Sequence, residues 1–299
     1  MQQVSEFKSG FVSIVGRPNV GKSTLTNQLV HNKVAIMSNK PQTTRNAIRG
    51  ILNLEEAQIV FIDTPGLHKP KTLLGERLNS IVRRTFNEVD VIAFVLDVSE
   101  PFGGGDEFIA RELAELKTPV ICLLNKADRS DPTKLLERIE EARGLGVWKD
   151  VLTTSATLGT GLKDFLDLVV ELLPPGPRFY PPDAVSDQPD TLVVSELIRE
   201  KIIERTREEV PHSIAVVVEE IQPREGTDLI DISAAVFVER DSQKGIVIGR
   251  GGRMLKEIGT RAREEIEALL GSRVFLDLRV KVEPNWQRKD QMLDRLGYR

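Results

Sequence analysis

A glycine-rich segment near the start of the chain has the residue types and spacing that bind phosphate. Gly16-Arg17-Pro18-Asn19-Val20-Gly21-Lys22-Ser23 matches the pattern G-x-x-x-x-G-K-[ST], and it follows an apolar run and precedes a helical pattern, as that motif requires. Its glycines allow backbone N–H groups to surround phosphate oxygens. We therefore expect Lys22 to reach the β- and γ-phosphates of a nucleotide and Ser23 to place its hydroxyl on Mg²⁺.

A second motif, Asp63-Thr64-Pro65-Gly66, could complete a metal and γ-phosphate site. An aspartate at the carboxyl end of a strand can hold Mg²⁺ through water, and the N–H of Gly66 can meet the γ-phosphate. Alone, these four residues could form a plain turn. A switch segment should supply a threonine to the Mg²⁺ shell, and we favour Thr44 over Thr43 for that position.

A third motif, Asn125-Lys126-Ala127-Asp128, points to the base. The Asp128 carboxylate can accept hydrogen bonds from guanine N1–H and the N2 amino group, which adenine cannot offer, and such a pair discriminates strongly. Lys126 can lie along the base plane, and Asn125 can bond across to the phosphate loop or to the base. The backbone N–H groups of Ser155 and Ala156 could meet guanine O6.

Every motif lies at the carboxyl end of an apolar strand pattern, where open α/β sheets bind ligands. A nucleotide-using metabolic kinase is an alternative, which the N-K-x-D spacing disfavours. The predicted nucleotide-binding residues are Gly16, Arg17, Pro18, Asn19, Val20, Gly21, Lys22, Ser23, Thr24, Asp63, Thr64, Pro65, Gly66, Leu67, Asn125, Lys126, Asp128, Ser155 and Ala156. The predicted metal ligands are Ser23, Thr44 and Asp63, and the predicted catalytic residues are Lys22, Thr44, Gly66 and Asn19.

The elements that must position these motifs form an α/β pattern. Short apolar runs alternate with helical segments, which favours a mostly parallel sheet covered on both faces. The expected strands are 11–15, 59–62, 91–96, 120–124 and 151–154, with 46–54 as an edge strand and 101–106 as a surface loop. Proline-rich sequence after Pro174 ends the pattern. We expect a first domain over 1–174, a linker over 175–190 and a second domain over 191–299.

The second domain has its own candidate site, the loop Gly249-Arg250-Gly251-Gly252. It fits the G-x-x-G loop of KH domains, which clamps about four nucleotides of single-stranded RNA. We expect a small α+β fold with the type II KH order, in which a helix over 192–209 and strands over 212–221 and 230–238 precede the loop, and a helix to about 270 and a strand over 274–282 follow it.

The charge near this loop supports RNA binding. Residues 244–263 contain six basic side chains and one acidic one, although a glycine turn before a helix can also be a plain connection. Ile246, Val247 and Ile248 could be groove floor or simple core. Trp286 and Tyr298 could stack on bases, but a tail packed on the domain is favoured. The predicted RNA-binding residues are Ile248, Gly249, Arg250, Gly251, Gly252 and Lys256.

Composition limits the remaining possibilities. The 299 residues carry a net charge of −4, so any nucleic-acid surface must be a local patch. The single cysteine, Cys122, cannot form an internal disulfide, and we expect a buried core thiol. The N-terminus lacks the apolar stretch of a signal peptide, and no segment approaches the roughly 20 apolar residues that span a bilayer. We expect a cytoplasmic protein.

These motifs resemble the translation-factor-related bacterial GTPases, and the whole chain is similar to the Era family, with G-R-P-N-V-G-K-S, Q-T-T-R-N, D-T-P-G-L, N-K-A-D, T-S-A and G-I-V-I-G-R-G-G. The resemblance implies a GTP/GDP- and Mg²⁺-binding GTPase that binds the 3′ end of small-subunit ribosomal RNA and assists assembly of the small ribosomal subunit. It also implies peripheral contact with the inner face of the cell membrane. We expect a monomer.

Two residues make the expected hydrolysis unusual. Ras-like proteins carry a water-orienting glutamine just after D-x-x-G, whereas this chain has Leu67. Slow intrinsic hydrolysis is therefore predicted. The resemblance implies a K⁺ site at Asn19, where a monovalent cation would supply the charge of an arginine finger. Alternatively, Asn19 only shapes the loop.

Overall fold

The computed structural model describes residues 6–298 except 39 and 41. The chain forms two compact units, one built mainly from residues up to Asp187 and one mainly from Gln188 onward. Two short stretches, Ser38–Thr43 and Thr72–Leu74, group with the second unit. Within the described residues, none of the helices combines the length and apolar character needed to cross a membrane.

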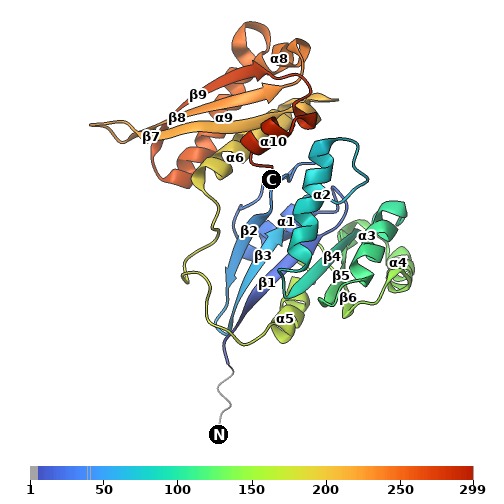
Figure 1. Cartoon of the computed structure of the whole chain (residues 1–299). Helices are drawn as coiled ribbons and strands as arrows, with labels where there is room; N and C mark the ends of the chain where they lie inside the picture. Colours follow the sequence, from blue (N-terminus) through green and yellow to red (C-terminus); the bar gives the residue numbers. More distant parts are fainter. Residues whose placement is uncertain (1–5, 39, 41, 299) are drawn as a thin grey trace. The chain divides into compact units, whose positions relative to one another are not determined.

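The first unit is built on a six-stranded sheet in the order β2-β3-β1-β4-β5-β6 (Figure 1). Every neighbouring pair is parallel except β2 and β3, which run antiparallel. The predicted mostly parallel sheet is confirmed, with the polar 46–54 segment at one edge. The strands are β1 Lys8–Val15, β2 Ile48–Asn53, β3 Ala57–Asp63, β4 Val91–Asp97, β5 Val120–Asn125 and β6 Asp150–Thr153.

Helices cover both faces of this sheet, so the strands β3, β4 and β5 are buried along their whole length and are mostly apolar. One core contains Leu25 of α1 and Phe165 of α5, and the other contains Val82 of α2, Ile109 of α3 and Ala142 of α4. The helices are α1 Lys22–Val30, α2 Leu73–Phe86, α3 Gly104–Ala114, α4 Pro132–Leu145 and α5 Leu162–Leu172, with a short 3₁₀ turn η1 over Ala127–Arg129.

The prediction of a surface loop over 101–106 is wrong in its second half. Helix α3 already begins at Gly104, and Asp106 is fully buried in its first turn. The Asp106 carboxylate accepts a hydrogen bond from the Gly103 N–H at 3.0 Å. An acceptor for an otherwise unpaired N–H stabilises a helix start, which offsets the low helix propensity of the neighbouring glycines.

Cys122 lies in the middle of β5 with no exposed surface, as predicted. Burial raises the pKa of its thiol to about 12, and the thiolate is the reactive form. We expect native protein to react with a thiol-specific disulfide reagent at least about a hundredfold more slowly than protein unfolded in guanidinium. Stopped-flow absorbance measures both rates, and comparable rates would contradict the buried placement.

The second unit has a three-stranded sheet in the order β7-β8-β9. Strands β7 and β8 are antiparallel, and β9 runs parallel to β8. Helices α6 and α9 pack on one face and share a core with it, including Ile198, Ile258 and Val236. The elements are α6 Asp190–Arg205, α7 Val210–Ser213, β7 Ala215–Pro223, β8 Leu229–Val238, α8 Asp241–Ile248, η2 Arg250–Gly252, α9 Arg253–Leu270, β9 Arg273–Val282, η3 Trp286–Arg288 and α10 Asp290–Arg295.

Three features of this unit differ from, or refine, the sequence-based expectation. His212 lies in the single-turn helix α7 rather than in a strand, which begins at Ala215. Helix α8 was not predicted. Trp286 is fully buried and donates from Nε1 to the Ser213 carbonyl oxygen at 2.9 Å, and Tyr298 is 3 % exposed. The tail therefore packs on the domain, as favoured.

Candidate functional site

The phosphate loop connects the end of β1 to α1, and its conformation requires glycine at position 21. Gly21 has φ 101°, a backbone conformation that side chains with a Cβ rarely adopt. A Cβ there would also lie 2.4 Å from Asn125 Nδ2. The loop is therefore held close against the end of β5, which carries the third motif.

Lys22 is buried at the first position of α1, with 6 % of its surface exposed. Its Nζ donates to the carbonyl oxygens of Gly16 at 3.1 Å and Arg17 at 2.8 Å. Burial lowers the pKa of Lys22 to about 8, and the charge of Asp63 opposes that shift. The ammonium thus lies inside the curve of the loop, where phosphate oxygens would bind.

The three predicted metal ligands lie together. Ser23 Oγ is 2.8 Å from Thr44 Oγ1 and donates to Asp63 Oδ2 at 2.6 Å, and Thr44 Oγ1 donates to the same oxygen at 3.2 Å. Thr43 instead donates to the Lys40 carbonyl oxygen. The structure thus places Thr44, the favoured threonine, beside Ser23 and Asp63.

The surroundings of the Asp63 carboxylate indicate whether this cluster could bind a cation. Asp63 is fully buried, and its Oδ1 has no hydrogen-bond partner. Burial raises the pKa of Asp63 to about 6, and Lys22, Ser23 and Thr44 oppose that shift. A buried carboxylate oxygen beside two hydroxyl groups forms the hard oxygen set that Mg²⁺ prefers. The residues fit Mg²⁺.

The residues after Asp63 pack directly on the phosphate loop. Thr64 Oγ1 donates to the Ile14 carbonyl oxygen at 2.7 Å, and Leu67 N–H donates to the Gly16 carbonyl oxygen at 3.2 Å. Pro65 and Gly66 lie between them and are buried. Leu67 is 1 % exposed, so its side chain belongs to the core and offers nothing to orient a water molecule.

The third motif is fixed by a network around Asn125, which is 1 % exposed. Its Nδ2 donates to the Val20 carbonyl oxygen at 2.8 Å, and its Oδ1 accepts from the Ala156 N–H at 2.9 Å. One amide therefore joins the phosphate loop to the T-S-A segment. Asp128 Oδ1 accepts from Ser155 Oγ at 2.5 Å, which orients the carboxylate predicted to read the base.

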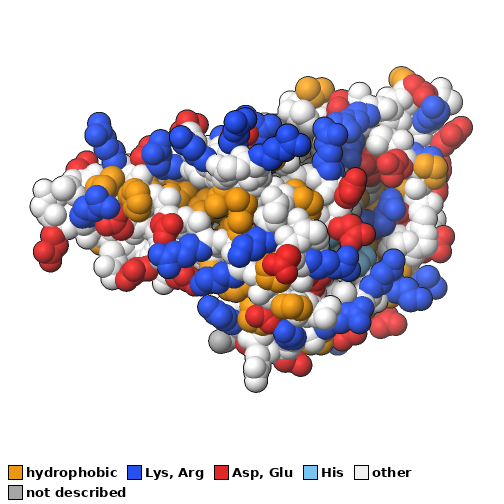
Figure 2. Space-filling model, turned by 90° about the horizontal axis from the view of Figure 1, so that it is seen from above, with side chains coloured by type: hydrophobic (Ala, Val, Ile, Leu, Met, Phe, Trp, Pro, Cys, Tyr) orange, Lys and Arg blue, Asp and Glu red, His pale blue; other side chains and the backbone are white. Residues whose placement is uncertain are grey.

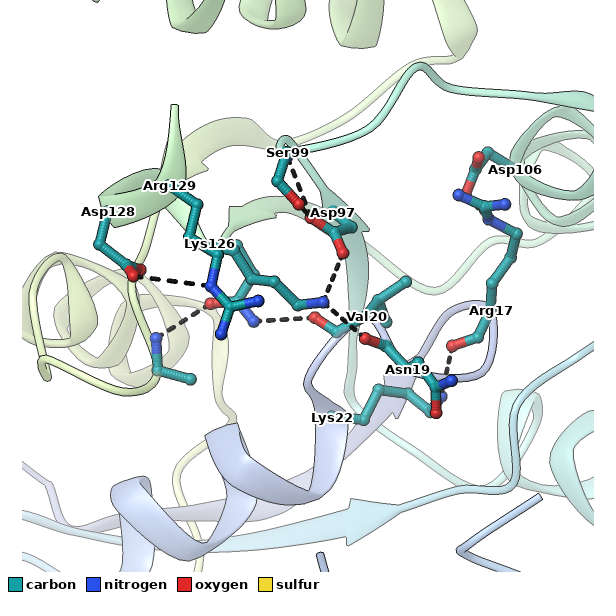
Figure 3. Close-up of polar contacts among 12 residues, drawn as sticks. Arg17, Asn19, Val20, Lys22, Asp97, Ser99, Asp106, Lys126, Asp128 and Arg129 are labelled. Carbon is teal, nitrogen blue, oxygen red and sulfur yellow. Dashed lines mark hydrogen bonds and ion pairs between the residues drawn. The ribbon is translucent and has the colours of Figure 1, made fainter. Parts of the chain in front are cut away.

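Lys126 has a partner that sequence analysis missed. It lies at φ 64°, and its Nζ donates to the Asn19 carbonyl oxygen at 2.8 Å and to Asp97 Oδ2 at 2.5 Å (Figure 3). Asp97 is 6 % exposed and also accepts from Ser99 N–H and Oγ. A signal was present, because Asp97 is the one polar residue of β4, at its carboxyl end.

The second candidate site, the G-x-x-G loop, lies between α8 and α9. Gly249, Gly251 and Gly252 have φ values of 72°, 61° and 77°, and Arg250 between them is exposed. Val247 is fully buried, Ile248 is half-buried and Ile246 is 49 % exposed. Helix α8 therefore divides these three residues between core and surface, and Ile248 stays beside the loop.

Exposed basic side chains lie in this loop and at the start of α9. Figure 2 shows Lys and Arg side chains along both sides of an apolar strip on one face of the molecule. On α9 the predicted Lys256 is exposed, and it lines a shallow depression together with two arginines, a threonine and two glutamates, Arg253, Arg261, Thr260, Glu257 and Glu264. Exposed cations next to the G-x-x-G loop suit the phosphate backbone of a single-stranded nucleic acid.

Comparisons with known proteins match both parts of the chain. A model described as 50S ribosome-binding GTPase matches residues 11–126, and a KH domain model matches residues 209–287. The chain is similar to a crystal structure of a single-residue variant of Aquifex aeolicus Era bound to GDP·AlF4⁻, with 40 % identity, a TM-score of 0.94, and coverage of 98 % of this chain and 99 % of that one.

It is equally similar to a structure of Era in complex with MgGDPNP and nucleotides 1506–1542 of 16S ribosomal RNA. Identity is 40 %, the TM-score is 0.93, and the match covers 98 % of this chain and 99 % of that one.

Proposed function

The chain belongs to the Era family of KH-domain GTPases, and from that membership we propose where it binds its GTP and its RNA. It is a GTP hydrolase with a mostly parallel GTPase domain followed by a KH domain. The nucleotide occupies the phosphate loop, with Lys22 on the β- and γ-phosphates and Asp128 on the guanine edge. The observation that carries this assignment is the convergence of Ser23, Thr44 and Asp63 beside Lys22.

Mg²⁺ would be held by Ser23, Thr44 and, through water, Asp63. When bound, the ion neutralises charge on the β- and γ-phosphate oxygens. The chain's own residues do the rest of the positioning. Lys22 supplies a second positive charge, Gly66 offers its N–H, and Asn125 holds the loop in register with the base site.

Slow intrinsic hydrolysis follows from Leu67, which cannot orient water. A K⁺ ion at Asn19 would supply the positive charge that an arginine finger provides in other GTPases. We expect the initial rate of GTP hydrolysis to be at least about tenfold higher in K⁺ than in Na⁺ at equal ionic strength, since each catalytic charge contributes at least that much. Phosphate release measures both rates, and Asn19→Ala should remove the difference. Equal rates in the wild type would favour the alternative that Asn19 only shapes the loop.

The KH domain is the proposed RNA site, with the 3′ end of small-subunit ribosomal RNA as its target. The support is the G-x-x-G loop with the exposed Arg250 and Lys256, together with a similar protein whose structure contains nucleotides 1506–1542 of 16S ribosomal RNA. Ile248, Gly249, Arg250, Gly251, Gly252 and Lys256 are the proposed contact residues. Through this contact the protein would assist assembly of the small ribosomal subunit.

The two sites would form a switch in which GTP orders the segments around Thr44 and Gly66. Thr44 lies beside Ser23 and Asp63, which supports an effect of the bound nucleotide on this segment. Equilibrium binding of GTP, GDP and ATP, with and without RNA of the 1506–1542 sequence, tests the proposal. We expect tight guanine-nucleotide binding, no ATP binding, and RNA affinity that depends on the nucleotide. ATP binding would refute the base assignment, and equal RNA affinity in all nucleotide states would refute the switch.

A cytoplasmic location, peripheral membrane contact and a monomeric state are further proposals, which rest on the family and on the sequence. Flotation with vesicles of anionic lipid tests the membrane contact, and light scattering tests the oligomeric state. Protein that stays at the bottom of the gradient at physiological salt would exclude direct lipid binding.

A further inference from the structure

Arg17, the second residue of the phosphate loop, points away from the base site. Figure 3 shows its side chain reaching the start of α3, on the opposite side from Lys126. Arg17 Nε donates to Asp106 Oδ1 at 2.7 Å, and both residues belong to the first compact unit. This ion pair has no part in the phosphate, metal or base contacts described above.

The burial and hydrogen bonding of Asp106 indicate that this ion pair is a structural contact, not a chance pairing at the surface. Asp106 has no exposed surface, whereas the Arg17 side chain is 29 % exposed. Asp106 uses both oxygens, because Oδ2 accepts from the Gly103 N–H at 3.0 Å while Oδ1 accepts from Arg17. A carboxylate removed from water in this way is stable only when it is paired.

The neighbouring helix turn leaves room for the arginine. A Cβ at Gly105 would lie 2.8 Å from Arg17 Cδ, closer than a side chain tolerates. Absence of a side chain at position 105 therefore lets the arginine stem pass over the start of α3. Gly105 is exposed and helical, so nothing else in its surroundings requires a glycine.

Arg17 is also tied to the site through its backbone. Its carbonyl oxygen accepts from Lys22 Nζ at 2.8 Å, and the preceding carbonyl, of Gly16, accepts from the Leu67 N–H at 3.2 Å. We propose that the Arg17–Asp106 ion pair is a positioning pair that holds the first half of the phosphate loop in its nucleotide-binding shape. The Arg17 side chain acts through the loop backbone, and its guanidinium does not itself contact phosphate. The inference rests on the proposed GTP site.

Asp106→Asn separates the two hydrogen bonds that the carboxylate accepts, one from Gly103 and one from Arg17. Asparagine keeps an oxygen for the Gly103 N–H but presents an NH₂ group to Arg17. In full-length protein, we expect release of a fluorescent GDP analogue to be about tenfold faster, the effect of losing one charge-assisted hydrogen bond. Glu107→Gln is the matched control, because Glu107 is the adjacent, exposed acidic residue in the same helix turn. We expect it to change release by less than about twofold.

Two further variants guard against a folding artefact. Gly105→Ala improves helix propensity yet displaces the arginine stem, so we expect it to speed release, with the gain in helix propensity offsetting part of the cost of the weakened pair in the thermal midpoint. Arg17→Ala in the Asp106→Asn background should add little, because both changes break the same pair.

Unchanged release in both Asp106→Asn and Gly105→Ala would overturn the inference. Slower release in Asp106→Asn would also overturn it, because it would mean that the freed arginine binds phosphate. Failure of the wild type to retain GDP would instead refute the proposed nucleotide site.

Discussion

Asp128→Asn is expected to lower the affinity for GTP and GDP about a thousandfold and to create affinity for xanthine nucleotides. A carboxylate accepts two hydrogen bonds from guanine, from N1–H and from the N2 amino group. Asparagine can accept only one and turns its NH₂ toward the other, which leaves two hydrogen-bond donors facing each other unpaired. Loss of such a pair in a recognition site costs factors of this order.

The local geometry favours a change of base preference from guanine to xanthine. Asp128 Oδ1 is held by Ser155 Oγ at 2.5 Å, and asparagine retains an oxygen that can accept the same bond. Its NH₂ group then faces the base, where xanthine carries a carbonyl oxygen in place of the guanine amino group. Equilibrium binding of GDP, xanthosine diphosphate and ADP to both proteins measures the change.

The chain offers a matched control three residues away. Asp131 caps α4 by accepting from the Lys134 N–H at 3.0 Å, and it is exposed. Asparagine is an equally good capping residue, so Asp131→Asn should leave GDP affinity within about twofold. An Asp128→Asn protein that still binds GDP as the wild type does would remove Asp128 from the base site.

That the motifs of the candidate nucleotide site meet was largely predictable, because they follow strands whose apolar runs are easily recognised. Parallel strands bring their carboxyl ends to one edge, so Asp63 and Asn125 had to meet the phosphate loop. The choice between Thr43 and Thr44 needed coordinates, since both side chains have the same chemistry. Only the structure turns Thr44 toward Asp63 and Thr43 toward the Lys40 carbonyl oxygen.

The missed features depend on tertiary contacts that leave little local signal. Three consecutive glycines disfavour a helix at 103–105, yet α3 forms because Asp106 caps it and Ile109 and Leu113 bury its inner face. Helix α8 contains Gly245 and three consecutive β-branched residues, a composition that favours a strand. Only Gln243 and Val247 on it are buried, so its apolar residues do not show the periodicity that would predict a helix.

Gly251→Asp is expected to weaken binding of RNA with the 1506–1542 sequence at least about a hundredfold. In KH domains this loop clamps the RNA backbone closely, and an aspartate adds both bulk and negative charge where phosphate would approach. In the free protein a Cβ at position 251 meets nothing within 4 Å. The substitution therefore leaves the packing of the unbound domain intact and acts mainly on the complex.

The backbone of Gly251 adds a cost that needs its own control. Its φ is 61°, and an L-residue in this left-handed conformation loses about 1–2 kcal/mol. Gly271 at the opposite end of α9 has φ 64° and equally open surroundings. Gly271→Asp thus introduces the same strain and charge in the same domain, and at a helix C-terminus the charge is less favourable than at the N-terminus.

The two variants separate RNA contact from domain stability. We expect Gly271→Asp to have the lower thermal midpoint and Gly251→Asp the lower RNA affinity, measured by fluorescence anisotropy at two salt concentrations. Addition of one negative charge near the phosphates should also reduce the salt dependence of whatever binding remains. If both variants lost RNA affinity equally, the loss would reflect general destabilisation or charge, and the G-x-x-G loop would no longer be the contact. A large loss confined to Gly251→Asp places the RNA backbone at the start of α9, because the variants share strain, charge and helix and differ only in which end they alter.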